Sequence, residues 1–246
     1  MKKLLTLILF LFISQTSYSQ ITGGSAISAG TLAWKFGVGI GLAYGFTSGT
    51  LNCECAYEFE NLKGPGFYVN GLGSKPLDYN SDFIFGLGFQ ILTLSSTVQM
   101  ARLKSVEDEP VPVNVNMESN ADVDISSLYL TLGYKRKLSD GFFFTGGLDM
   151  HLVTDCNLAQ DETIKDERFT FASSGKTTGP IYEGDLKDYN NIQCNLKVGL
   201  SYDIVFDYKW LITPNVSLSY PLLKFTSSSS ARLMVLTLGI NILYMF

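Results

Sequence analysis

Hydrophobic and polar residues alternate along most of this chain, with the two-residue period of a β-strand. The pattern is clearest over the last sixteen residues, 231–246, where large apolar side chains occupy every second position. The intervening positions are smaller, and they become more polar towards the middle of the segment. A tilted membrane-spanning strand needs about 9–11 residues with apolar side chains outward. The C-terminal pattern therefore predicts a strand that faces lipid.

The same alternation recurs along the chain. In residues 34–46, WKFGVGIGLAYGF, bulky apolar residues alternate with glycine, alanine and one lysine. Small residues are expected inside a narrow barrel, because its interior holds only side chains. Pro214 is an irregularity, since proline removes a ladder hydrogen bond. The pattern predicts strands at 34–46, 66–77, 82–93, 123–138, 142–153, 192–204, 210–222 and 231–246.

The connections between these strands alternate in length. Turn-forming sequences at 78–81, 139–141 and 206–208 are short, whereas the connections at 47–65, 95–122 and 155–190 are long, and serines 227–230 form a fourth loop. Outer-membrane barrels have an even strand count, with short periplasmic turns and longer extracellular loops. We therefore predict an all-β fold, an eight-stranded antiparallel up-and-down transmembrane β-barrel, with both termini in the periplasm. This orientation predicts an aromatic girdle at the periplasmic interface, formed by Trp34, Tyr134, Phe142, Trp210, Tyr244 and Phe246.

A ten-stranded barrel that also used residues 51–60 and 97–105 would keep the even count. It is disfavoured because the second segment would point Arg102 and Lys104 at lipid. Residues 51–60 are instead expected to form a hairpin above the membrane. A soluble β-barrel or sandwich would alternate similarly, but it would bury the bulky face and leave the glycine-rich face to water.

The N-terminus has the features of a secretory signal peptide. Lys2 and Lys3 precede an apolar run at 4–13, and the polar sequence SQTSYSQ follows. We expect residues 1–19 to be removed, residues 20–33 to form a periplasmic lead-in and residues 34–246 to form the barrel. Removal of the two lysines leaves 16 basic and 23 acidic residues, a net charge of −7. This acidity argues against nucleic-acid binding, which needs lysine and arginine at phosphates.

Four cysteines are present, and an exported chain permits disulfides. Cys156 and Cys194 flank one long loop, so a bridge between them would close the base of that loop. Cys53 and Cys55 are candidates for a loop disulfide or half of a zinc site. No histidine accompanies that pair, so the zinc interpretation is the weaker one.

The predicted barrel interior carries the remaining candidate chemistry. The inward polar residues are Lys35, Gln90, Lys135, Asp149, His151, Asn195, Lys197 and Asp203. Asp149 and His151 share one strand face, with Asn195 and Lys197 as neighbours on the next strand, so an acid–base pair is one interpretation. A salt-bridge network is the other, because buried charges must be paired. We favour the network and a non-enzymatic protein, since no serine is recognisably spaced to meet the histidine. Eight strands enclose only side chains, so no general porin is expected.

No sequence motif indicates a cofactor or a metal site. The acidic loop 155–190 lacks the regular oxygen spacing of a calcium-binding loop, and no phosphate-binding glycine loop precedes a helix.

The segments WKFGVGIGLAYGF, GFYVNGLGSKPLDYNSDFIFGLGF and LYLTLGYKRKLSDGFFFTGGLDM, with the closing strand, resemble the outer-membrane β-barrel domain family that includes PorT-like proteins. OmpA-like eight-stranded barrels are a broader relative. The ending, with Tyr244 and Phe246 at alternate positions, resembles the signal by which the outer-membrane assembly machinery recognises barrels. The resemblance implies a bacterial outer-membrane location and contacts with outer-membrane lipid, lipopolysaccharide and that machinery.

Three functions follow as hypotheses. The first is a scaffold whose extracellular loops bind a surface ligand or protein. The PorT-like resemblance implies a second, a component of protein secretion or envelope assembly. A third is an outer-membrane enzyme built on Asp149 and His151.

Overall fold

The computed structural model describes residues 33–52, 58–104, 113–166, 169–171, 175–207 and 209–246. The predicted signal peptide, 1–19, and all but the last residue of the lead-in, 20–33, lie outside the described residues. The strands are β1 (Lys35–Ser48), β2 (Thr50–Asn52), β3 (Glu58–Glu60), β4 (Lys63–Asp78), β5 (Ser81–Lys104), β6 (Val113–Lys137), β7 (Phe142–Ile164), β8 (Thr178–Asp185), β9 (Ile192–Tyr202), β10 (Ile204–Asp207), β11 (Trp210–Pro221) and β12 (Arg232–Met245). The described part of the chain contains no helix long and apolar enough to cross a membrane.

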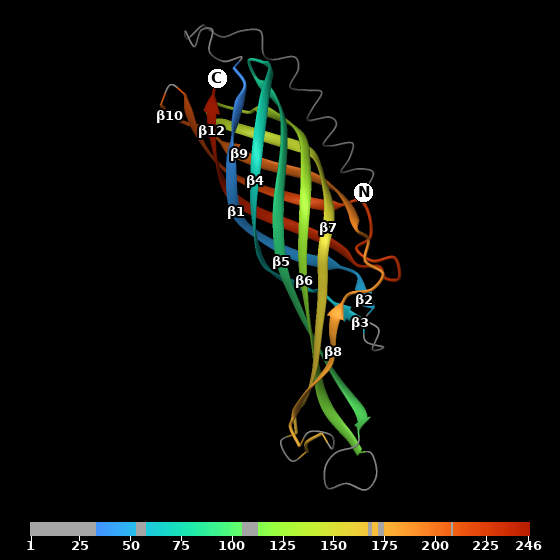
Figure 1. Cartoon of the computed structure of the whole chain (residues 1–246). Helices are drawn as coiled ribbons and strands as arrows, with labels where there is room; N and C mark the ends of the chain where they lie inside the picture. The colour runs from blue at the N-terminus through green and yellow to red at the C-terminus, as the bar shows by residue number, and fades with distance from the viewer. Residues whose placement is uncertain (1–32, 53–57, 105–112, 167–168, 172–174, 208) are drawn as a thin grey trace. The chain divides into compact units, whose positions relative to one another are not determined.

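Eight strands pair into a closed ring in the order β1, β4, β5, β6, β7, β9, β11 and β12 (Figure 1). Every neighbouring pair is antiparallel, and β12 pairs with β1 from Lys35↔Met245 to Ser48↔Arg232, which closes the sheet. The eight-stranded antiparallel barrel predicted from the sequence is confirmed. The ten-stranded alternative is wrong: residues 51–60 contribute a separate two-stranded hairpin, β2–β3, and residues 97–104 continue β5.

The two ends of the barrel differ as predicted. Because Lys35 pairs with Met245, β1 begins where β12 ends, and the turns after β4, β6 and β10 lie at this same end, the short-turn end (Figure 1). The first turn is closed by the Asp78 carboxylate, which accepts a hydrogen bond from the Asn80 N–H at 2.7 Å. In the second turn Gly141 has a φ of 78°, a conformation that favours glycine. The longer connections lie at the opposite end, the long-loop end.

Two of the predicted loops are wrong, because strands continue through them. β5 and β6 stay in register without a shift out to Lys104↔Val113, within the predicted loop 95–122. β7 runs on to Ile164 and pairs with β8, within the predicted loop 155–190. These continuations form a β-sheet that extends beyond the ring, here called the arm (Figure 1). The arm comprises residues 96–104 of β5, 113–122 of β6, 155–164 of β7 and all of β8.

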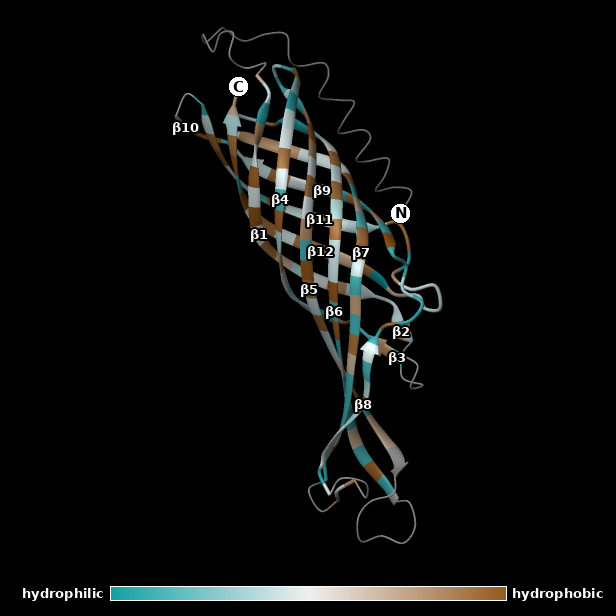
Figure 2. Ribbon diagram, viewed as in Figure 1, coloured by the Kyte–Doolittle hydropathy of each residue, from teal (hydrophilic) through white to brown (hydrophobic). Residues whose placement is uncertain are grey.

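The outer surface of the ring is apolar. Exposed aliphatic side chains occur on every ring strand, among them Ile40, Val69, Leu87, Leu130, Leu148, Val198, Val216 and Leu238. Figure 2 shows hydrophobic and hydrophilic residues following one another along these strands. The pattern then inverts along the three strands that continue into the arm. On β6 the outward residues change from leucine to polar at Ser126, and the inward residues become apolar from Ile125 onward. The outward change falls between Ile91 and Thr93 on β5, between Leu128 and Ser126 on β6, and between Leu152 and Asp155 on β7. We call this the switch level.

Aromatic side chains gather at the short-turn end, where the sequence predicted a girdle. Trp34 stacks on Phe36 with ring centroids 5.7 Å apart, and Trp210 packs edge-on against Tyr244 at 5.1 Å. Phe246 contacts both Tyr244 and Phe36, so the C-terminal residue closes the aromatic contacts across the β12–β1 seam. Such a girdle is typical of the interface between a bilayer and water.

Candidate functional site

Charged side chains inside the ring form ion pairs with one another. The three ion pairs are Lys35–Asp82 at 2.6 Å, Lys135–Asp203 at 2.6 Å and Lys197–Asp149 at 3.2 Å. Two of the pairs join different strands, and the third joins Lys135 of β6 to Asp203 between β9 and β10; all six side chains point away from lipid. Three lysines and three aspartates leave this set without net charge. Pairing is what a buried charge requires, because an isolated one is costly to remove from water.

Hydroxyl groups also donate hydrogen bonds to the three carboxylates. Ser74 donates to Asp82 at 2.8 Å, and Thr213 donates to Asp203 at 2.9 Å. Asp149 accepts two further hydrogen bonds, from Thr131 at 2.6 Å and from Ser219 at 3.1 Å. Each carboxylate is therefore held by an ammonium group and by at least one hydroxyl, which fixes its position.

The position of Asp203 depends on an interruption of the sheet. The N–H of Leu222 bonds to the carbonyl of Cys194, so even-numbered residues of β11 direct their backbone groups at β9. Pro214 is one of these residues and has no N–H to donate. No β-pair is formed at Pro214 or Thr213 with β9 or β10, and Asp203 lies between those two strands. The irregularity predicted at Pro214 thus lies at the interruption of the sheet where Asp203 turns its carboxylate into the lumen.

A serine that was not predicted lies beside the only histidine. Ser127 Oγ is 3.2 Å from His151 Nδ1, and the Tyr129 ring stacks on the imidazole with centroids 5.2 Å apart. The arrangement lacks the third member of a catalytic triad, because the Asp149 carboxylate is bonded to Thr131, Ser219 and Lys197 instead. Ser127 is 4% exposed, and the cavities that touch His151 are each about 20 Å³.

The predicted lumen residues all lie inside the barrel, and the structure joins some of them and separates others. Lys197 pairs with Asp149, and Lys135 pairs with Asp203. Asn195 stands opposite Asp149 in the β7–β9 register, yet its side-chain oxygen has no hydrogen-bond partner. Gln90 is buried near His151, where both line the same small cavity. The predicted network is therefore three separate ion pairs rather than one continuous chain.

Several residues that hold this network were not predicted from the sequence. They are Asp82, Ser74, Thr131, Thr213, Ser219 and Ser127. Strand parity carried the signal for Asp82, because its position in β5 is even, like that of the inward Gln90. The hydroxyls had no such signal, since serine and threonine are common on both faces of these strands.

A cavity of about 100 Å³ lies in the half of the lumen nearer the short-turn end. Lys135, Lys197 and Asn215 line it, and so do two buried atoms without a hydrogen-bond partner, Asn70 Oδ1 and Ser201 Oγ. A water needs about 10–15 Å³ of such space and two to four polar partners. The cavity therefore has room for several waters that would satisfy the two atoms.

The half of the lumen nearer the long-loop end is filled by apolar side chains. Leu92, Leu94, Val123 and Ile125 come from the barrel wall, and each is at most 3% exposed. Segments outside the ring add to this loop-end core: Leu51 and Phe59 from the β2–β3 hairpin, Leu186 after β8, and Phe225 before β12. The expectation of a plugged lumen from charged and polar residues was thus incomplete, because the plug is mainly apolar.

The structure does not bring Cys156 and Cys194 together; both are free thiols. Cys194 lies opposite Met150 on the outer face, whereas Cys156 is six residues further along β7 and faces inward. Six residues of strand span roughly 20 Å, far beyond the 7 Å that a disulfide can bridge. A register shift at Thr154 turns Cys156 to the inner face. The candidate pair Cys53 and Cys55 lies outside the described residues.

No group of three or more ligating side chains that could hold a metal ion occurs among the described residues. The expectation that no cofactor is bound stays a prediction.

A closed antiparallel barrel with an apolar exterior and paired charges inside defines the chain as a transmembrane β-barrel. Neither a protein-family model nor a curated protein matches the sequence.

Solved structures resemble the chain only distantly. The attachment invasion locus protein Ail of Yersinia pestis is 10% identical, with 86% of this chain and 99% of that one covered and a TM-score of 0.36. OprG of Pseudomonas aeruginosa is 12% identical, with 88% and 98% covered and a TM-score of 0.38. The Escherichia coli outer-membrane protease OmpT is 11% identical, with 90% and 99% covered and a TM-score of 0.37. The fold assignment rests on the strand pairings themselves.

Proposed function

We propose that this protein is an integral outer-membrane barrel that does not form a pore, and that it presents its arm outside the cell to bind a cationic partner. Both termini lie in the periplasm in this proposal. The short turns at the terminal end and the long strands at the other support this orientation, since outer-membrane barrels place short turns in the periplasm.

The lumen supports an anchoring role rather than transport. The loop-end core contains fully buried side chains such as Phe59 and Phe225, at 0% and 2% exposure. The ion pairs occupy the other half of the lumen. A permeating solute would have to displace both the lysine–aspartate pairs and the loop-end core. Neither the displaced charges nor the displaced apolar side chains would have other groups nearby to contact. The barrel therefore acts as a rigid support.

The single observation that carries the binding proposal is the acidic outer face of the arm. Six exposed carboxylates lie on neighbouring strands at this face or, in the case of Asp124, just beside it on β6, and none forms an ion pair with a described residue: Asp122, Asp124, Asp155, Asp161, Glu183 and Asp185. Partial burial raises the pKa of Asp122 above its ordinary value, and the nearby charges of Asp124 and Asp161 raise it further. These carboxylates repel one another, so a cationic surface would relieve the repulsion on binding.

A trimmed variant tests the binding role. Replacing residues 97–120 and 159–183 each with an Asn-Gly turn joins strands at paired positions, Ser96↔Ala121 and Leu158↔Gly184. The probe is a fluorescent decalysine peptide, added to proteoliposomes. We expect the wild type to bind it in a salt-sensitive manner and the trimmed barrel, which keeps four of the six carboxylates, to bind it more weakly. A second variant with the six carboxylates changed to amides should lose binding with its arm intact. Equal binding by all three proteins would refute the proposal.

Orientation and conductance are tested separately. Trypsin added to intact cells should cleave at Lys165 or Lys176 beyond the arm, and Lys137 and Lys209 at the short-turn end should be protected. The reverse pattern would contradict the orientation. In a planar bilayer the wild type should show no sustained conductance, whereas a steady open level would contradict the closed lumen.

A further inference from the structure

We propose that the outer wall of the barrel carries a binding site for one phospholipid, formed by β1, β4 and β5 near the short-turn end. The site consists of Lys75, an aromatic cluster and an unfilled position at Gly71. The proposal uses the lipid-facing wall of the barrel and is independent of what the arm binds.

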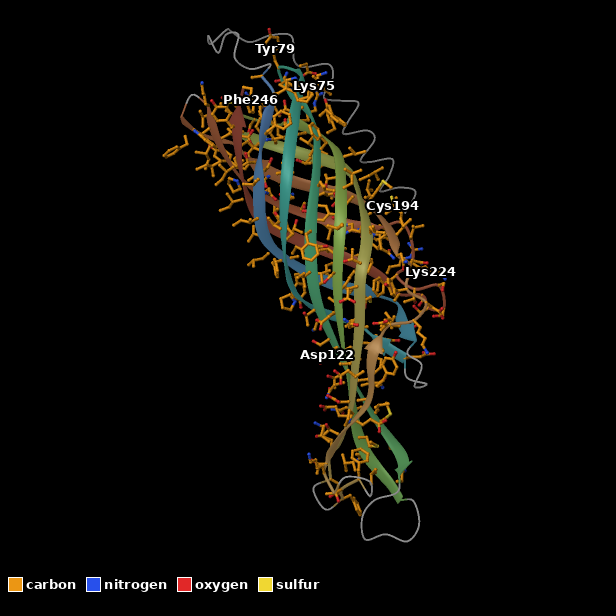
Figure 3. All side chains as sticks on the ribbon, in the orientation of Figure 1. Lys75, Tyr79, Asp122, Cys194, Lys224 and Phe246 are labelled. Carbon is orange, nitrogen blue, oxygen red and sulfur yellow. The ribbon has the colours of Figure 1, made fainter. Side chains whose placement is uncertain are left out.

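Lys75 supplies a cation at the edge of the apolar belt. Its ammonium nitrogen lies 5.3 Å from the ring centroid of Trp34, a cation–π distance, and the side chain is exposed. No carboxylate among the described residues pairs with it. Lys75 is therefore free to bind an anion, and Figure 3 shows it at the short-turn end beside Tyr79.

Three aromatic rings form a platform next to this cation. Trp34 stacks parallel to Phe36, and Phe85 packs edge-on against both rings at 6.3 and 6.1 Å. The Phe85 ring lies directly over Gly73, where any Cβ would collide with it. Glycine at this position thus lets the ring lie flat on β4. Aromatic rings at this depth suit the glycerol and ester region of a lipid, which is neither fully polar nor fully apolar.

The next outward position of β4 is open. A Cβ added at Gly71 would meet only the Leu87 carbonyl oxygen, at 3.9 Å, so no side chain fills this part of the wall. Its cross-strand neighbours, Val38 and Leu87, are 60% and 64% exposed. An apolar gap of this kind is matched by hydrocarbon rather than by water.

The spacing of these parts matches a phospholipid. Four residues of strand separate Lys75 from Gly71, which is roughly 13 Å along β4. A lipid phosphate at Lys75 would therefore place the upper part of one acyl chain over Gly71, with the backbone of the lipid against Trp34 and Phe36. A free phosphate would use only the cation, and a fatty chain alone would use only the gap.

A second cation at the same end provides a matched control. Lys209 lies 5.8 Å from the Tyr244 ring centroid and is also exposed. The outward positions beside it on β11 and β12 are filled by Ile212 and Ile242, so it has no gap for an acyl chain. Lys209→Gln removes a comparable charge without touching the proposed site.

Native mass spectrometry of the detergent-solubilised barrel, titrated with palmitoyl-oleoyl phosphatidylglycerol, tests the site. We expect one lipid to bind more tightly than the rest. Lys75→Gln and Gly71→Leu should each weaken it about fivefold to tenfold, which corresponds to the loss of one charge-assisted contact or one buried chain segment. Lys209→Gln should bind like the wild type. Gel mobility before and after heating confirms folding of each variant.

Three results would overturn the proposal. Lipid binding by both Lys75→Gln and Gly71→Leu at the wild-type level would show that this site does not exist. An equal loss in Lys209→Gln would reduce it to general charge. Equally tight binding of dioleoylglycerol, which has no phosphate, would exclude the role of Lys75.

Discussion

The lipid-facing part of the ring and the arm share the strands β5, β6 and β7, but the polarity of the outward and inward faces is opposite in the two regions. Below the switch level the outward side chains are apolar and the inward ones are small, polar or charged. Above it the outward side chains are polar and the inward ones are apolar, as in a water-soluble sheet. On β6 the outward residue Leu130 and the inward residue Val123 stand for the two arrangements, at 41% and 0% exposure. The contrast shows that the surrounding medium, lipid or water, sets the polarity of the outward face, whichever strand a residue belongs to.

Loss of one side chain should lower the free energy of unfolding by different amounts in the two halves of the lumen, and most in the half that contains the ion pairs. Lys135→Met leaves the Asp203 carboxylate buried without its ammonium partner, which should cost about 3–5 kcal/mol of unfolding free energy. The double variant Lys135→Met/Asp203→Leu should recover most of that loss, because no unpaired charge remains. Urea unfolding from lipid vesicles, followed by tryptophan fluorescence, measures both. A single variant as stable as the wild type would mean that the pair is not desolvated.

The apolar interior should behave as a packed protein core. Leu94 is 1% exposed, so Leu94→Ala should destabilise the barrel by about 2–5 kcal/mol through lost burial and a cavity. Gln99→Ala, at an exposed position on the outward face of the same strand, should change stability by less than about 0.5 kcal/mol. The same unfolding experiment distinguishes them. Similar values for the two variants would show that the loop-end core is not packed.

The outer surfaces should differ in their tolerance of charge. Leu130→Arg places a cation in the belt and should cost about 2–4 kcal/mol if the residue lies near the bilayer midplane. Asn116 lies outward and exposed on the same strand above the switch level, and Asn116→Arg should change stability by less than about 0.5 kcal/mol. Folding yield into vesicles and unfolding in urea provide the measurements. Equal tolerance of the two arginines would contradict the assignment of lipid to the belt.

The smallest effect concerns the acidic face of the arm. The pKa of Asp122 is raised in the fold, so this group's contribution to stability is present below its ordinary pKa of 3.8 and is lost as pH rises through the raised value. Asp122→Asn should therefore reduce the decrease in stability as pH rises. It should stabilise the arm at neutral pH by roughly a few tenths of a kcal/mol after solvent screening.

Hydrogen exchange of β6 amides between acidic and neutral pH, corrected for intrinsic rates, measures this change. Asp140→Asn serves as a control of opposite sign, because Lys137 lowers the pKa of Asp140 and its contribution is lost as pH falls. The same direction in both variants would contradict the account.

Alternation alone predicted the ring and most of its inward residues, because lipid on one side forces a strict period on each strand. It missed the arm for a physical reason. Residues 113–125 alternate as well, but with valine and methionine inward and asparagine and aspartate outward. Lipid-facing strands are predicted from bulky outward residues, so this inverted pattern was predicted to be a loop. The inverted alternation itself was visible in the sequence.

Local irregularities explain the other differences. The shift at Thr154 changes the parity of β7, and that change placed Cys156 on the inner face away from Cys194. Contacts between distant strands, such as Ser127 with His151, depend on register, which hydrophobic periodicity does not specify.

The switch level is tested most directly by spin labels placed one at a time at the outward positions of β6, from 116 to 132, in lipid vesicles. Collision with oxygen reports lipid, and collision with a water-soluble nickel complex reports solvent. We expect high nickel accessibility from 116 to 126 and high oxygen accessibility from 128 onward, with the step between these two positions. Uniform accessibility along the strand, or a step within 116–122, would contradict the account.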